Sequence, residues 1–168
     1  MMSQENDDKA FRELLRHGTG FLQQGKYQDA LQFLQKAYDL RPDDIDASLN
    51  LSGAYILNKK FSKAVPLLEA LSEQLPDNAM IWTNLGAAYL GNPVLSDEPM
   101  QDRAIAAFEQ ALALDSEAPS VAYNIGLIYY LYKKDKVAAK PWFERAVASY
   151  PRDLDAQSYL DKIAAEEE

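Results

Sequence analysis

The side chains that most often carry chemistry are scarce in this sequence. There is no cysteine, and His17 is the single histidine. Without cysteine a chain has no disulfide, no thiolate metal ligand and no thiol nucleophile. One histidine leaves little for general acid-base catalysis near neutral pH. Any catalytic or metal site must therefore be built from carboxylates, amides and hydroxyls.

Carboxylates gather at 43–46 and at 97–102, and oxygen ligands of this kind can hold a divalent cation. The same residue types are also common in solvated turns and at helix N-caps, which is the interpretation we favour. The sequence has no EF-hand spacing, Gly-rich phosphate loop, HExxH or nucleophile elbow. We therefore expect no metal site, no cofactor and no enzymatic activity. The two groups are Asp43, Asp44 and Asp46, and Asp97, Glu98 and Asp102.

Charge and hydropathy narrow the choice of partners. The 168 residues include 17 Lys and Arg against 26 Asp and Glu, for a net charge of −9, and 48% are apolar. A negative field repels nucleic-acid phosphates and anionic membrane surfaces, so we expect a protein partner and neither nucleic acid nor a membrane. The acidic start is unlike a secretory signal, and the apolar stretch from Ile125 to Leu131 is too short to span a bilayer. A cytoplasmic protein is the expectation.

The positions of these residues depend on an internal repeat. The segment Asn50 to Tyr55 recurs 34 residues later, from Asn84, and again after a further 40, from Asn124. A second pattern, which begins at Ala30, recurs from Ala64, Ala104 and Ala139. Within each segment the apolar and small residues are three and four apart, which is typical of an amphipathic helix. Each repeat unit is therefore predicted to contain two helices, and strand signals are absent.

The spacing of Trp82, Leu85, Gly86 and Tyr89, followed by Ala104, Phe108 and Ala111, resembles the tetratricopeptide repeat (TPR) consensus. The resemblance implies an all-α solenoid of helix-turn-helix units. We expect four repeats, at 11–44, 45–78, 79–118 and 119–153, with a capping helix at 154–168. Together they form one domain over 9–168, preceded by a disordered segment 1–8.

The sequence departs from the consensus at several points. His17 stands at position seven of the first unit, where the family favours leucine, and Ser52 takes a place that is usually glycine. Between the two helices of the third unit, 91–100 contains six residues more than a regular turn. Asp7 or Asp8 is the expected N-cap of the first helix.

Position six of each unit defines a candidate binding face. It lies about 200° around the first helix from position four, opposite the side that packs on the second helix. The resemblance implies that this face lines a concave groove, where asparagines grip the main chain of a peptide. The alternative is that the asparagines serve contacts between repeats. Position six is occupied by Arg16, Asn50, Asn84 and Asn124.

Apolar and aromatic residues flank these positions and suit hydrophobic anchors of a bound segment. The alternative is that many of them pack repeat on repeat. A two-lysine clamp, which the family uses for the acidic C-termini of heat-shock chaperones, is not evident. The flanking candidates are Leu49, Thr83, Tyr123, Leu127 and Tyr130.

The leading functional hypothesis is a protein-interaction module, an adaptor or scaffold that binds a peptide segment of a partner in the concave groove of the first helices. A second hypothesis is a small TPR-type chaperone that shields an export substrate. A third is a structural module that associates with itself as a homo-oligomer.

Overall fold

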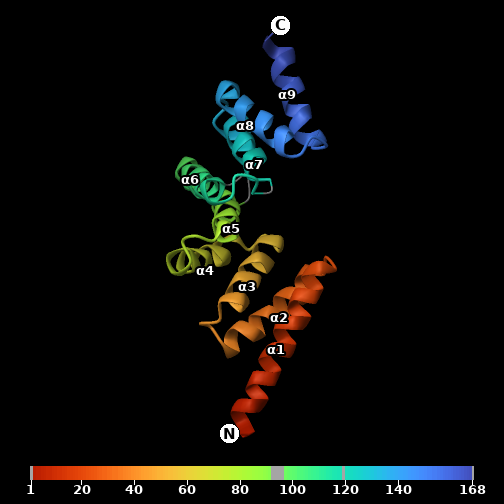
Figure 1. The fold of residues 1–168 in the computed structure, drawn as a ribbon, viewed down its shortest axis with the longest axis vertical. Helices are drawn as coiled ribbons and strands as arrows, with labels where there is room; N and C mark the ends of the chain where they lie inside the picture. The colour runs from red at the N-terminus through yellow and green to blue at the C-terminus, as the bar shows by residue number, and fades with distance from the viewer. Residues whose placement is uncertain (1, 92–96, 119, 168) are drawn as a thin grey trace.

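The computed structural model describes residues 2–91, 97–118 and 120–167 (Figure 1). Along these residues the chain is helical throughout, with no strand, which confirms the predicted all-α class. Residues 92–96, the middle of the predicted insertion, lie outside the described residues. The helices are α1 (Met2–Gln23), α2 (Tyr27–Leu40), α3 (Ile45–Leu57), α4 (Phe61–Gln74), α5 (Ala79–Leu90), α6 (Glu98–Leu114), α7 (Val121–Leu127), the π-helical segment η1 (Ile128–Tyr132), α8 (Lys136–Ser149) and α9 (Leu154–Glu167).

The helices are arranged as a solenoid of successive pairs. α1 packs on α2, α3 on α4, α5 on α6, and α7 with η1 on α8, while each pair also contacts the next one. α9 packs on α8. Figure 1 shows an elongated molecule whose two termini lie at opposite ends. In such an array the contacts are made almost entirely between neighbours, so each pair depends on the adjacent ones for its stability.

Polar caps define where most of the later helices begin. The Asp44 carboxylate accepts a hydrogen bond from the Ala47 backbone N–H at 2.9 Å, and the Asp97 carboxylate accepts one from Met100 at 3.0 Å. Such caps satisfy backbone donors that have no partner within the helix. Members of both predicted carboxylate groups therefore act as N-caps. The same role is taken by Asn78, Asp135 and Asp153.

Small residues in the first helix of a pair allow the second helix to approach closely. A Cβ built on Gly86 would lie 2.5 Å from the Phe108 ring, and one on Gly126 would lie 2.8 Å from the Phe143 ring. Both phenylalanines are completely buried. The repeated glycine and phenylalanine positions are thus complementary parts of one helix-helix contact.

The departure at His17 has a structural reason. At position seven, Leu51, Leu85 and Ile125 are buried. Each of these residues belongs to a helix that packs on the preceding pair. His17 belongs to the first pair and is exposed, with its ring edge against Phe33 at a centroid distance of 5.7 Å. Among the described residues no other helix pair packs on this side of α1, so a polar residue is tolerated there.

The N-terminus differs from the expectation of disorder over 1–8. α1 begins at Met2, so the helix already includes Asp7 and Asp8 and neither is its N-cap. Asp8 instead forms an ion pair with Arg41, the residue that follows α2. The same guanidinium lies over the Phe11 ring at 4.4 Å. These contacts hold the start of α1 against the end of α2, and they join residues far apart in the sequence.

The π-helical segment accommodates a change in repeat length. The spacing from Tyr129 to Ala139 is one residue longer than that from Tyr55 to Ala64. In η1 the Lys133 backbone N–H donates to the Ile128 carbonyl at 3.1 Å, five residues earlier. A π-turn takes up one extra residue without ending the helix. Tyr130 of η1 lies against Phe143 of α8, with ring centroids 6.3 Å apart.

None of the helices in the described part of the chain combines the length and apolar character needed to cross a bilayer.

Candidate peptide-binding face

Each asparagine at position six shares a face with the residues four before and three after it, whereas the residues three before and four after it are buried. In α3 this face contains Asp46, Asn50, Gly53 and Leu57, none of which is buried, and Leu57 is 46% exposed. We call the corresponding set on all three helices the ladder face. Its other members are Met80, Asn84 and Ala87 of α5, and Ser120, Asn124, Leu127 and Leu131 around α7 and η1, and none of them is buried.

The ladder asparagines differ in how their amides are used. The Asn50 side-chain NH2 donates to the Asp46 carbonyl at 2.7 Å, within its own helix. The side chains of Asn84 and Asn124 make no hydrogen bond to any other residue that the structure describes. Both amides are half-buried at the surface of their helices. They therefore retain donors and acceptors for an added main chain.

At the first pair the ladder position is Arg16, as predicted. Arg16 is exposed, and its guanidinium lies 3.1 Å from the His17 ring nitrogen Nε2. The first pair thus offers a cation where the others offer an amide.

The predicted flanking residues pack mainly between helices. Leu49 packs on the core cluster that α2, α3 and α4 share. Tyr123 and Tyr130 lie against Tyr159 of α9, at ring-centroid distances of 6.3 and 5.0 Å. Thr83 is an exception, because its hydroxyl donates to the Ala79 carbonyl at 2.9 Å within α5. The other contacts favour the interpretation that the flanks hold neighbouring units together, with the ladder face left open.

Leu127 belongs to both groups. It is half-buried and packs on the cluster around Phe143, yet it shares the helix face of Asn124.

A second feature is a groove across α4, α5 and α6, with a volume of about 520 Å³. There the Tyr89 hydroxyl donates to the Glu69 carboxylate at 2.7 Å. The Arg103 guanidinium donates to the same carboxylate at 2.6 Å and to the Tyr89 oxygen at 2.8 Å. Burial, followed by the hydrogen bond to Glu69, raises the pKa of Tyr89 to about 12, although Arg103 opposes the shift.

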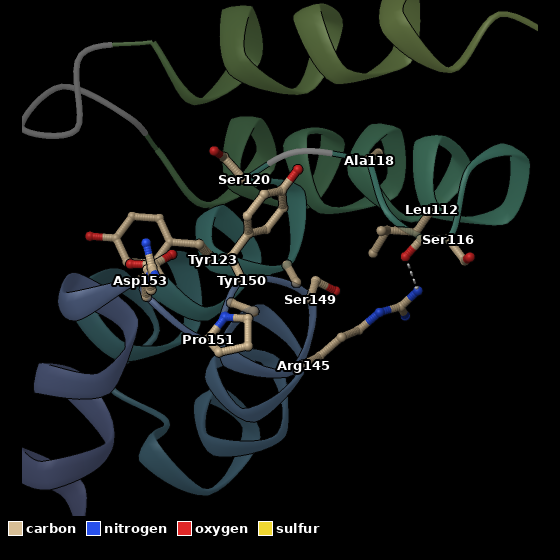
Figure 2. Close-up of a pocket in the computed structure, with 13 residues that line it drawn as sticks. Leu112, Ser116, Ala118, Ser120, Tyr123, Arg145, Ser149, Tyr150, Pro151 and Asp153 are labelled. Atoms are coloured by element: carbon tan, nitrogen blue, oxygen red, sulfur yellow. Dashed lines mark hydrogen bonds between the residues drawn. The ribbon is translucent and has the colours of Figure 1, made fainter.

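A third feature, which the sequence patterns did not predict, is a cavity of about 610 Å³ between the ends of α6 and α8 and the start of α7 (Figure 2). We call it the α6–α8 socket. Of the predicted site residues it includes Tyr123. The signal in the sequence is Ala122, which stands where the preceding unit has Trp82. The socket is lined by Leu112, Ser116, Ala118, Ser120, Ala122, Tyr123, Arg145, Ala146, Ser149, Tyr150, Pro151, Arg152 and Asp153.

Each predicted carboxylate group contains a residue that caps a helix, Asp44 in the first and Asp97 in the second. Across the residues that the structure describes, no group of three or more His, Asp or Glu side chains is arranged to hold a metal ion. Asp102, from the second carboxylate group, accepts a hydrogen bond from the Lys133 ammonium at 2.6 Å.

Comparison with known protein families shows that two family models together match most of the chain. A family model described as tetratricopeptide repeat matches residues 21–88, and a second model with the same description matches 102–153. Among solved structures, MamA (41 to the end) from Desulfovibrio magneticus RS-1 is similar with a TM-score of 0.72 and 26% identity, over 85% of this chain and 77% of that chain.

TTC0263, a TPR protein of Thermus thermophilus, has a TM-score of 0.74 over 94% of this chain and 82% of that chain. At 18% identity this is a likeness of fold alone. The peroxisomal targeting signal receptors of Kluyveromyces lactis and Candida albicans are 27% identical over 96 and 84 residues. Those alignments cover 57% and 50% of this chain but only 16% and 13% of the receptors.

Proposed function

Because the chain belongs to the tetratricopeptide repeat family, we propose that it is an interaction module that binds an extended peptide segment of a partner protein along the ladder face. The observation that supports this most is the unburied ladder face itself. Its asparagines recur on α3, α5 and α7. Asparagine contributes little to an exposed helix, so its recurrence favours a role in binding.

The chemistry of the ladder face suits main-chain recognition. Each free carboxamide has both a donor and an acceptor, so it can pair with a peptide N–H and C=O together. Beside the amides, Leu57 is 46% exposed and Met80 is 57% exposed. No side chain lies within 4 Å of a Cβ built on Gly53, which leaves room for a backbone close to α3. The ladder face thus combines amides that can hydrogen-bond to a peptide main chain with apolar side chains that can pack against it.

The name of the matched receptors supports the same class of function. They are receptors for a targeting signal, and the part that this chain resembles is a limited region of each. From these names we infer for this chain only the recognition of a protein segment, and we do not transfer the identity of the signal.

The test uses peptides selected from a random twelve-residue display library on the wild-type protein. We expect Asn50→Ala, Asn84→Ala and Asn124→Ala combined to weaken binding about tenfold or more, at roughly 0.5–1.5 kcal/mol for each neutral hydrogen bond lost. Isothermal titration measures the affinity and thermal melts measure stability. Stability should hold or rise, because alanine is the better helix former.

A matched control removes three amides from second helices, where Gln32, Gln74 and Gln110 are exposed. Replacing these with alanine should leave peptide affinity unchanged. If the asparagine triple variant melts at a lower temperature and still binds its peptides normally, the asparagines serve contacts between repeats and the proposal is wrong.

A further inference from the structure

The α6–α8 socket has a counterpart one unit earlier, where Trp82 takes up part of the space and a groove of about 520 Å³ remains beside it. Trp82 of α5 packs between the α4 and α6 sides of the array. Its indole N–H donates to the Pro76 carbonyl at 2.7 Å. Pro76 belongs to the turn that joins α4 to α5. An indole thus lies in this space between units and satisfies a turn carbonyl.

In the next unit the corresponding residue is Ala122, and the corresponding turn carbonyl is that of Ser116. The Arg145 guanidinium donates to this carbonyl at 3.1 Å, in place of an indole N–H (Figure 2). The hydrogen bond is therefore preserved while the volume of the indole is left empty. Trp142 of α8 packs on the neighbouring clusters and is not part of the socket lining.

One unit before Trp82 the equivalent residue is Ser48, whose hydroxyl lies 3.4 Å from the Pro42 carbonyl. The cavity there is about 100 Å³, and Tyr38 is part of its wall. The volume does not follow the size of this side chain alone, because the groove beside Trp82 is about 520 Å³. In the last unit a space of about 610 Å³ is left beside a small residue.

We propose that the α6–α8 socket binds a tryptophan side chain of a partner protein, with a carboxylate group next to it. The walls formed by Leu112, Ala118 and Ala146 are apolar and suit an indole. Arg145 is held in place by the Ser116 carbonyl and offers a guanidinium face for stacking. The incoming ring thus takes the place that the Trp82 ring takes in the preceding unit.

The carboxylate part of the proposal follows from charge. The socket includes two guanidinium groups, Arg145 and Arg152, in a chain whose net charge is −9. The carboxylate in its wall, Asp153, accepts a hydrogen bond from the Ala156 backbone N–H at 3.0 Å as the cap of α9. Arg152 is exposed at the rim. A ligand carboxylate is the complementary group for this side chain.

The site differs from the ladder face, although Ser120 is common to both and Tyr123 is one of the flanking residues. The probes are small molecules that contain only the groups proposed for this site. N-acetyl-L-tryptophan has both the indole and a carboxylate, and N-acetyl-L-tryptophanamide lacks the carboxylate. We expect the acid to bind about two- to fivefold more tightly than the amide, the size of an exposed ion pair. N-acetyl-L-leucine should bind more weakly than either.

Two substitutions test the indole and the carboxylate separately. Ala122→Trp places an indole where the preceding unit has one, and it should weaken both tryptophan probes about tenfold or more by occupying the site. Its matched control is Ala10→Trp, at an exposed position on α1. Arg152→Gln should remove the preference for the acid over the amide, whereas Arg12→Gln, at another exposed position on α1, should retain it.

Binding is followed by titration calorimetry and by NMR of the protein with labelled alanine methyl groups. In the wild type, the methyl signals of Ala118, Ala122 and Ala146 should shift with N-acetyl-L-tryptophan. These methyl shifts test the proposal even if Ala122→Trp does not fold. Absence of those shifts at millimolar probe, or an Ala122→Trp protein that folds and binds the probes as the wild type does, would overturn the proposal.

Discussion

At the scale of single residues, Tyr89 links three helices through its phenol. It donates to Glu69 of α4 and accepts from Arg103 of α6, at 2.7 and 2.8 Å. Its pKa is raised from the ordinary value of 10.0 to about 12, first by burial and then by Glu69. The folded state therefore favours the neutral phenol. The stability this gives is fully present below pH 10 and is lost as the pH rises from about 10 to about 12.

We accordingly expect the melting temperature of the wild type to fall more steeply between pH 10 and 12 than that of Tyr89→Phe, which has no phenol to ionise. Burial also raises the pKa of Tyr55, Tyr123 and Tyr132, and those contributions are common to both proteins. Thermal melts at stepped pH give the two slopes, with Tyr27→Phe as an exposed control. Equal slopes for wild type and Tyr89→Phe would contradict this account.

At the scale of the helix pair, the close contact of α5 with α6 depends on the absence of a side chain at Gly86. A Cβ there would lie 2.5 Å from the Phe108 ring, and Phe108 is completely buried. At Gly53 nothing lies within 4 Å of the corresponding Cβ. The same substitution should therefore have opposite effects at the two sites.

We expect Gly86→Ala to destabilise the protein by about 1–3 kcal/mol, because the added methyl overpacks a closed contact. Gly53→Ala should stabilise it by about 0.5–1 kcal/mol through helix propensity. Urea unfolding followed by circular dichroism gives both values. A neutral or stabilising Gly86→Ala would mean that α6 shifts at little cost and that the glycine is not required for packing.

At the scale of the whole molecule, the solenoid presents polar residues at both ends. The first helix exposes Arg12, Arg16 and His17. At the other end α9 covers the cluster around Phe143, whose ring stacks on Tyr159 at a centroid distance of 4.9 Å. The outer side of α9 is polar, with Asp161 and Lys162 among its exposed residues. These are the properties that an array of repeats needs at its termini.

Removal of 154–168 should expose the Phe143 cluster and cause aggregation or loss of a cooperative melt. The loss of an interface of this kind is expected to cost several kcal/mol. Light scattering and thermal melts are the measurements, with Ser158→Ala in the full chain as a control on the exposed side of α9. A truncated protein that stays monomeric and melts at the wild-type midpoint would rule out a capping role.

The sequence alone determined the helical class, the repeated two-helix pattern and the principal core positions. This follows because residues three and four apart share a helix face, so Leu85, Gly86 and Phe108 reveal their packing through local spacing. The same geometry placed Asn50 and Asn84 on an unburied face.

Only the tertiary structure decided features that depend on residues distant in the sequence. The start of α1 is stabilised by Arg41, beyond the next helix. Tyr130 contacts Tyr159 because α9 packs on α8. Periodicity alone was compatible with either role of Tyr130, packing between repeats or binding a peptide. The α6–α8 socket forms beside Ala122, between the turn that joins α6 to α7 and the turn that joins α8 to α9. Periodicity shows which side of a helix is buried, whereas how completely neighbouring units fill the space between them depends on side chains that the fold brings together.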